Sequence, residues 1–95
     1  MFDRILKRMR DRIRSRRYVM TLHAEEEMDA DGLTIYDVER GILSGKIVRR
    51  QRDEGTREWK YRIRGRTIDG IEVEVIAKLG PTGKLVVLTV YLPQG

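Results

Sequence analysis

The chain has no cysteine and only one histidine among its 95 residues. The absence of cysteine excludes disulfide bonds, cysteine-based zinc sites and thiol redox chemistry, and it fits a cytoplasmic protein. The single histidine, His23, is the only side chain whose unperturbed pKa lies near neutral pH. No apolar run approaches the roughly 20 residues of a membrane span, and the charged N-terminus lacks a signal-peptide core, so we expect no membrane partner.

Positive charge gathers at the N-terminus of a chain whose remainder is nearly neutral. The formal net charge is +5, and residues 1–17 hold eight Lys or Arg against two Asp, which leaves the rest of the chain at −1. Any attraction to a polyanion should therefore come largely from this segment. A charged fraction of 37% beside periodic apolar residues is typical of an ordered domain with a very polar surface.

Residues 2–17 have the pattern of an amphipathic helix. Their apolar side chains recur every three or four positions and so share one stripe: Phe2, Ile5, Leu6, Met9 and Ile13. The first interpretation is a helix that packs this stripe on the core and leaves a solvated basic face. The second is that the basic face binds RNA, and the third is a helix lying on an anionic membrane. The RNA-binding candidates on this helix are Arg8, Arg12, Arg16 and Arg17. We divide the chain into this basic helix, residues 1–17, and a single α+β domain, residues 18–95.

Two further helices are predicted next. Thr21 is a good N-cap for a helix over residues 22–30. Thr34, with Asp37 three residues later, forms a variant of the capping box and starts a helix that ends at Gly45. The side chains expected to face the core are Leu22, Ala24 and Met28 in the first helix, and Ile35, Val38, Ile42 and Leu43 in the second.

After Gly45 the apolar period changes from near four to two, which is the period of a β-strand. Four strands are predicted, separated by turn signals: residues 46–52, 57–67, 71–79 and 84–92. This order predicts an α+β two-layer sandwich, with two or three N-terminal helices packed on a four-stranded antiparallel meander.

The last predicted strand is apolar on both faces. Leu85 and Val87 share one face, and Val86, Leu88 and Val90 share the other. A strand with one buried face should alternate apolar and polar residues. We therefore expect either the N-terminal helix or a partner, including a second copy of the chain, to cover the second face.

Two stretches, separated by a strand pair, carry a resemblance to a known family: LHAEEEMDADGLTIYDVERGILSGKIV and the closing VVLTVYLP. They resemble a small prokaryotic family, domain of unknown function 4258. The family pattern is His-Ala, acidic residues, Arg-Met, Arg-Gly-Ile-Ser, a short helix with a glycine, and a final Thr-Val-Tyr strand. The resemblance covers roughly residues 18–93. It implies a relation to the RelE-like and BrnT-like toxins of toxin–antitoxin systems. It therefore implies a RelE-like two-layer fold, RNA cleavage without a metal, and an antitoxin as partner.

By this resemblance the family's histidine falls on His23, and its hydroxyl residues on the last strand fall on Thr89 and Tyr91. Metal-independent RNA cleavage needs a base for the 2′-hydroxyl proton, an acid for the leaving 5′-oxygen and a cation beside the phosphorane. His23 suits either proton transfer, and Tyr91 suits an acid or a positioning hydroxyl. Arg62 or Arg64 suits the cation, because a guanidinium binds phosphate bidentately. The candidate catalytic residues are His23, Arg62, Thr89 and Tyr91, Arg64 joins the RNA-binding set, and no metal or cofactor is expected.

Two positions depart from the family pattern and favour a second hypothesis. Glu27 and Asp31 stand where the family usually carries arginine, so any phosphate-binding charge there is reversed. A histidine just after a threonine cap is often structural, and acids in a first helical turn complement the helix dipole. His23 and Glu27, four residues apart, could bind a metal, but such a pair on an acidic helix is more often a surface pair. The alternative function is a non-catalytic module that binds RNA or a protein.

Overall fold

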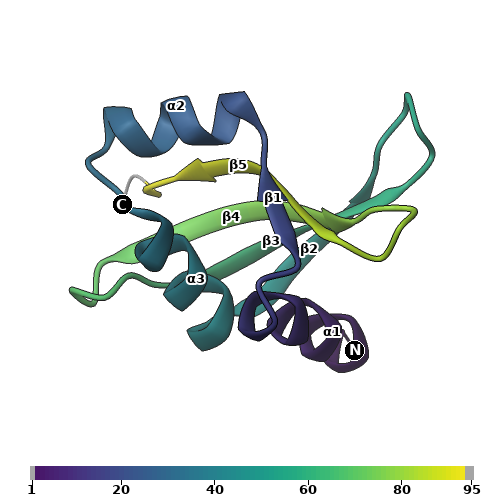
Figure 1. Cartoon of the computed structure of the whole chain (residues 1–95), viewed down its shortest axis with the longest axis horizontal. Helices are drawn as coiled ribbons and strands as arrows, with labels where there is room; N and C mark the ends of the chain where they lie inside the picture. Colours follow the sequence, from purple (N-terminus) through teal and green to yellow (C-terminus); the bar gives the residue numbers. More distant parts are fainter. Residues whose placement is uncertain (1, 94–95) are drawn as a thin grey trace.

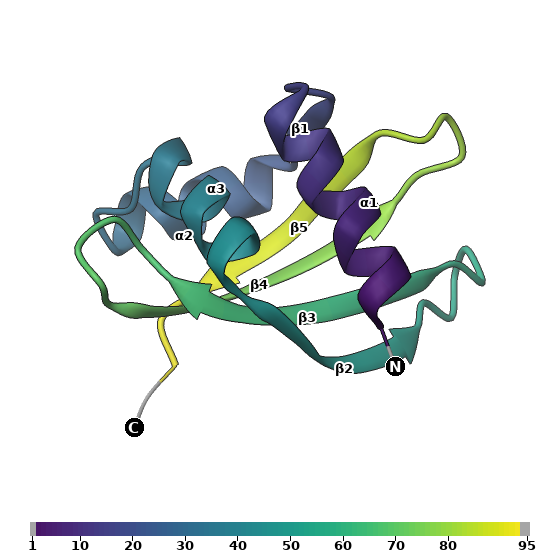
Figure 2. The ribbon, with the colours of Figure 1, turned by 90° about the horizontal axis from the view of Figure 1, so that it is seen from below.

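The computed structural model describes residues 2–93, which form three helices and one five-stranded sheet (Figure 1). The elements in chain order are α1 (Asp3–Arg14), β1 (Tyr18–Met20), α2 (Leu22–Ala30), α3 (Ile35–Ser44), β2 (Lys46–Arg52), β3 (Trp59–Arg66), β4 (Glu72–Leu79) and β5 (Leu85–Tyr91). The strand order is β1-β5-β4-β3-β2. The helices lie on the same side of the sheet (Figure 2), so its other side, here called the open face, carries no helix.

The α+β prediction is confirmed, but the prediction of a four-stranded antiparallel sheet is wrong. β1 adds a fifth strand that runs parallel to β5, with Tyr18 opposite Leu85. The Leu85 N–H donates to the Arg17 carbonyl at 3.1 Å, and the Thr21 N–H donates to the Val87 carbonyl at 3.0 Å. A strand of three residues is too short to show an alternating pattern, so the sequence does not predict it.

The predicted caps start both later helices. The Thr34 hydroxyl accepts a hydrogen bond from the Asp37 N–H at 3.3 Å, and the Asp37 carboxylate accepts one from the Thr34 N–H at 3.0 Å. The Thr21 hydroxyl accepts from the Ala24 N–H at 3.1 Å and donates to the Leu88 carbonyl at 3.1 Å, so it joins α2 to β5. The helix predicted over residues 2–17 is shorter, and Arg16 beyond its end has a positive φ of 58°.

The core lies between the helices and the sheet. Its helical side chains are Leu6, Met9 and Ile13 from α1, Ala24 and Met28 from α2, and Val38 and Ile42 from α3. This confirms the core-packed interpretation of α1. Leu22 and Ile35 are exposed, which corrects the prediction that both face inward. Each is the first residue of its helix, and the buried side chains of these helices begin further along, at Ala24 and Val38. Within the described residues, no helix is long and apolar enough to cross a membrane.

A β-bulge explains the two apolar faces of β5. Thr89 pairs with Ile76 and Val87 pairs with Ala77, which leaves Leu88 as an extra residue. The bulge puts Val90 on the same side as Val87, and both are fully buried, while Leu88 is half-buried. α2, rather than the N-terminal helix, lies along β5 (Figure 1). Since β5 has β1 on one side and β4 on the other, it is not an edge strand that is open to a second copy.

α3 approaches β3 very closely where Gly41 faces Gly65. A Cβ atom on Gly65 would lie 1.9 Å from the Gly41 carbonyl oxygen. Only glycine allows two backbones to pack at this separation. The contact fixes α3 on the end of β3 that also carries Arg64 and Arg66.

Candidate functional site

The open face of the sheet carries two neighbouring rows of mainly polar side chains. Residues paired across adjacent strands point to the same face, so the strand register defines each row. The first row is Lys46, Arg64, Glu74 and Tyr91, and the second is Arg49, Arg62, Ile76 and Thr89. Four of the residues predicted from the sequence, Arg62, Arg64, Thr89 and Tyr91, therefore lie together in two adjacent rows.

Glu74 is the centre of this arrangement. It is only 3% exposed although it sits on a face without helices, because its neighbours cover it. The Tyr91 hydroxyl donates to Glu74 Oε1 at 2.5 Å, and Arg64 Nε donates to Glu74 Oε2 at 2.8 Å. Arg62 Nε lies 3.6 Å from Oε1 and, among the described residues, has no hydrogen-bond partner although it is buried. Arg64 also reaches Glu72 at 3.5 Å.

The contacts set the protonation of the cluster. Burial would raise the pKa of Glu74, but hydrogen bonds from Tyr91 and Arg64 and the charges of Arg64 and Arg62 outweigh it, so this pKa lies below its ordinary value. Burial, together with the hydrogen bond to Glu74 and its charge, raises the pKa of Tyr91. At neutral pH the carboxylate is ionised and the phenol is neutral. The cluster is therefore built to hold two guanidinium groups in fixed positions, while Glu74 is a weakened base and Tyr91 already donates its proton.

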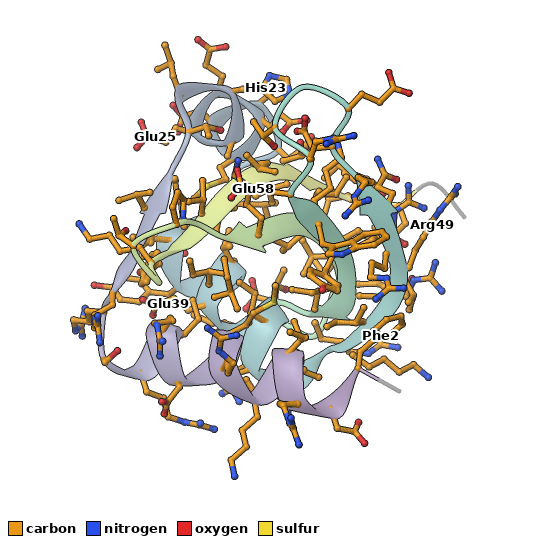
Figure 3. The ribbon with its side chains drawn as sticks, turned by 90° about the vertical axis from the view of Figure 1, so that its right-hand side faces the viewer. Phe2, His23, Glu25, Glu39, Arg49 and Glu58 are labelled. Atoms are coloured by element: carbon orange, nitrogen blue, oxygen red, sulfur yellow. The ribbon has the colours of Figure 1, made fainter. Side chains whose placement is uncertain are left out.

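His23 lies apart from this cluster. It occupies the first turn of α2, its side chain is 66% exposed, and its ring is at the outer surface of that helix (Figure 3). Its Nε2 atom lies 3.4 Å from Glu27 Oε1, and the same oxygen accepts a hydrogen bond from the Val90 N–H at 3.0 Å. Val90 stands between Thr89 and Tyr91. His23 is thus joined to the end of β5 through Glu27, and the described residues show no hydrogen bond or ion pair between it and the Glu74 cluster.

Residues 20–92 match the model of a protein family described as domain of unknown function (DUF4258). The chain belongs to the DUF4258 family. The matched range contains every residue of the two rows and His23, whereas α1 precedes it. No curated protein and no solved structure matches the chain.

Sequence reasoning missed what two glutamates do in this DUF4258 domain. Glu27 stands where the resemblance leads one to expect arginine, and its carboxylate accepts the Val90 N–H. An arginine has no acceptor and could not take this role. The sequence does not single out Glu74, because the pattern EVEV shows alternation but not which carboxylate is buried. Its signal was the arginine-rich strand β3, which pairs with β4 and supplies both guanidinium partners.

The RNA-binding residues predicted on α1 do not join the open face. Arg12 Nε donates to the Gly83 carbonyl at 2.6 Å, which ties α1 to the β4–β5 turn. Arg8 lines a separate cavity beside β3, and Arg16 and Arg17 are exposed after the end of α1. Because α1 lies on the helix side of the sheet (Figure 2), these arginines and Arg64 belong to opposite sides of the domain.

Metal ligands are sparse in the described residues. No group of three or more His, Asp or Glu side chains is arranged there to hold a metal ion. The pair of His23 and Glu27 supplies only two ligand side chains, and Glu27 Oε1 already accepts a hydrogen bond from a backbone amide.

Proposed function

We propose that this DUF4258 domain acts on RNA and binds the phosphate backbone on the open face of its sheet. The observation that carries the proposal is the pair of rows, which holds four cationic side chains: Arg62 and Arg64 lie at the buried carboxylate of Glu74, and Lys46 and Arg49 are their partners on β2. Regularly placed cations on one surface are the usual basis of nucleic-acid affinity.

The arginines in these rows keep donors for a ligand. A guanidinium has five N–H donors, and Arg64 uses only part of its set on Glu74 and Glu72. Lys46 and Arg49 have no carboxylate within 4 Å among residues 2–93. In this proposal Glu74 and Tyr91 are positioning residues, which hold two guanidinium groups in place, and the outer N–H groups bind phosphate oxygens.

Fluorescence anisotropy with a labelled single-stranded RNA, repeated over a range of salt concentrations, tests this proposal. Arg49→Gln should weaken binding and reduce the slope of log affinity against log salt by about 0.7, the value for one phosphate contact on a single strand. Arg40→Gln on α3 removes the same charge from the helix side and should change neither quantity. Absence of measurable RNA binding, or equal effects of the two variants, would remove the proposal.

A second candidate function is toxin-like, metal-independent RNA cleavage, with an antitoxin as the partner that silences it. One observation favours it: the predicted Arg62, Thr89 and Tyr91 lie in adjacent rows, and Glu27 connects His23 to the same end of β5. In this version His23 takes the proton of the 2′-hydroxyl, Tyr91 gives a proton to the leaving 5′-oxygen, and Arg62 stabilises the charged phosphorane. This version requires RNA binding to bring His23 to the same phosphate, because its ring lies apart from Arg62 and Tyr91 in the free domain.

RNA cleavage in the presence of a chelator separates the two candidates. If the domain is a nuclease of this kind, His23→Ala should abolish cleavage and leave RNA affinity nearly unchanged, because the ring is exposed and not part of the rows. Equal cleavage by His23→Ala and the unaltered protein, or no cleavage by either, would remove the catalytic version and leave the binding proposal in place.

A further inference from the structure

The only tryptophan, Trp59, forms an arginine–aromatic strip with Phe2, Arg50 and Arg52. The guanidinium carbons of Arg50 and Arg52 lie 4.1 Å and 4.7 Å from the centre of the Trp59 ring, and Arg50 also lies 5.9 Å from the centre of the Phe2 ring. Trp59 is nevertheless 38% exposed. Arg50 pairs with the buried Tyr61 and Arg52 with Trp59, so the strip lies on the helix side of the sheet, opposite the Glu74 cluster.

A cavity of about 220 Å³ adjoins the strip, between α1 and the sheet. Its lining is Ile5, Arg8, Glu58, Trp59, Tyr61 and Leu79, which is two aromatic rings, two aliphatic side chains and two charged ones. Glu58 is already paired with Lys78 at 3.0 Å. The volume is below the roughly 300 Å³ of pockets for drug-sized ligands, and it suits a single flat ring system.

The cations around this cavity are free to bind an anion. Within residues 2–93, Arg8, Arg50 and Arg52 have no carboxylate within 4 Å, whereas Arg62 and Arg64 on the open face share Glu74. Single-stranded nucleic acids are bound by cations at their phosphates and by aromatic rings that stack on their bases. Arginine side chains stacked on an exposed aromatic ring, beside a mainly apolar cavity of one-ring size, supply both contacts. Charge complementarity therefore favours a polyanion with flat aromatic groups over a neutral or basic protein partner.

We propose that the strip and its cavity bind single-stranded RNA: one unpaired base enters the cavity and stacks on Trp59, while Arg50 and Arg52 bind the flanking phosphates. The inference rests on the proposed function and narrows its substrate to unpaired RNA. A base in a duplex is stacked on both faces and cannot enter a cavity in the side of a protein, but an unpaired base can. Arg8 of α1, predicted from the sequence as an RNA contact, borders the same cavity.

Because Trp59 is the only tryptophan, its fluorescence reports on this site alone. An unstructured single-stranded RNA of about twelve nucleotides should quench the emission saturably, with the midpoint that anisotropy gives, and a duplex of the same length should not. Trp59→Leu should weaken binding of the single strand by about 5- to 140-fold, the range for loss of one base–aromatic stack. Trp59→Phe should lose less affinity, because it keeps an aromatic ring. Circular dichroism checks that each variant is folded.

The outcomes separate this site from the proposed function. RNA binding by anisotropy without a change in Trp59 emission, together with unchanged affinity of Trp59→Leu, would overturn the site and leave the proposed function standing. Equal quenching by duplex and single strand would overturn the requirement for an unpaired base. Equal quenching by polyglutamate would overturn base stacking in favour of a surface that selects only for charge. No RNA binding of any kind would remove the proposed function itself.

Discussion

Glu74→Gln should move stability and RNA affinity in opposite directions. The substitution keeps the shape of the side chain and removes a buried negative charge from the open face. Glutamine can still accept one hydrogen bond, but its NH₂ group faces guanidinium donors that it cannot satisfy. Arg62 and Arg64 then lose the charge that balances them, and both become more available to phosphate.

The magnitudes follow from burial. Loss of a hydrogen bond to a charged group lowers the free energy of unfolding by about 1–3 kcal/mol. The lower part of this range applies here, because the side chains of Arg62 and Arg64 are 32% and 48% exposed and can bind water instead. For a domain of this size, 1 kcal/mol corresponds to a fall of about 4–8 °C in Tm. The affinity gain should be about 2- to 5-fold, the range of an exposed ion pair.

Denaturant unfolding followed by Trp59 emission, and RNA anisotropy at fixed salt, measure the two effects. Glu72→Gln is the matched control, because it removes the same charge from the same face. Glu72 is half-buried, and among residues 2–93 its carboxylate has one cationic partner, Arg64, at 3.5 Å. It should raise RNA affinity with little loss of stability. If folded Glu74→Gln binds RNA more weakly than the unaltered protein, or is equally stable, the reasoning is refuted.

Three further predictions concern the fold and its pH dependence. Gly65→Ala should cost about 1–3 kcal/mol or more in unfolding free energy, because its Cβ would lie 1.9 Å from a carbonyl oxygen of α3, whereas Gly55→Ala in the β2–β3 turn should be nearly neutral. The hydrogen bond from the Thr34 N–H in the capping box, together with those from the Ile68 N–H and the Thr34 hydroxyl, lowers the pKa of Asp37. The stabilising contribution of Asp37 is therefore full above the unfolded value of about 4 and is lost as the pH falls through the lower folded value, and Asp37→Asn should flatten this part of an acid titration of stability. Glu27→Arg, which restores the expected family residue, should lower Tm because the Val90 N–H loses its acceptor; an unchanged Tm would show that this hydrogen bond contributes nothing.

Local signals predicted most of the elements. The capping box of Thr34 and Asp37 involves residues three positions apart, and strand alternation is visible within seven or eight residues. The missed strand β1 depends on Leu85 and its neighbours, more than sixty positions away. The bulge at Leu88 is of the same kind, because the register of β5 is set by β4 and by Thr21 rather than by its own composition. Non-local pairing of this sort leaves no periodic trace in a sequence.

The candidate site was also predictable only in part from the sequence. Residue chemistry indicates Arg62 and Arg64, which alternation in β3 puts on one face, and the family resemblance indicates Thr89 and Tyr91. The convergence of the arginines and Tyr91 on Glu74 was not predictable, because a glutamate in an alternating strand is normally solvated. What buries it is the size and charge of side chains from two neighbouring strands.

The strand β2 gives the two proposed RNA contacts a common position. It is an edge strand, and its basic side chains alternate between the two sides of the sheet: Arg49 pairs with Arg62 on the open face, and the next residue, Arg50, reaches Trp59 on the helix side. Charged side chains on such an edge also oppose pairing with another chain. Protection of the edge explains why these side chains are charged. It does not explain why Arg50 and Arg52 stack on an exposed tryptophan. A flexible single strand that crosses this edge could bind phosphates with Arg49 on one side and stack a base on Trp59 on the other, whereas a stiff duplex could not follow so sharp a path.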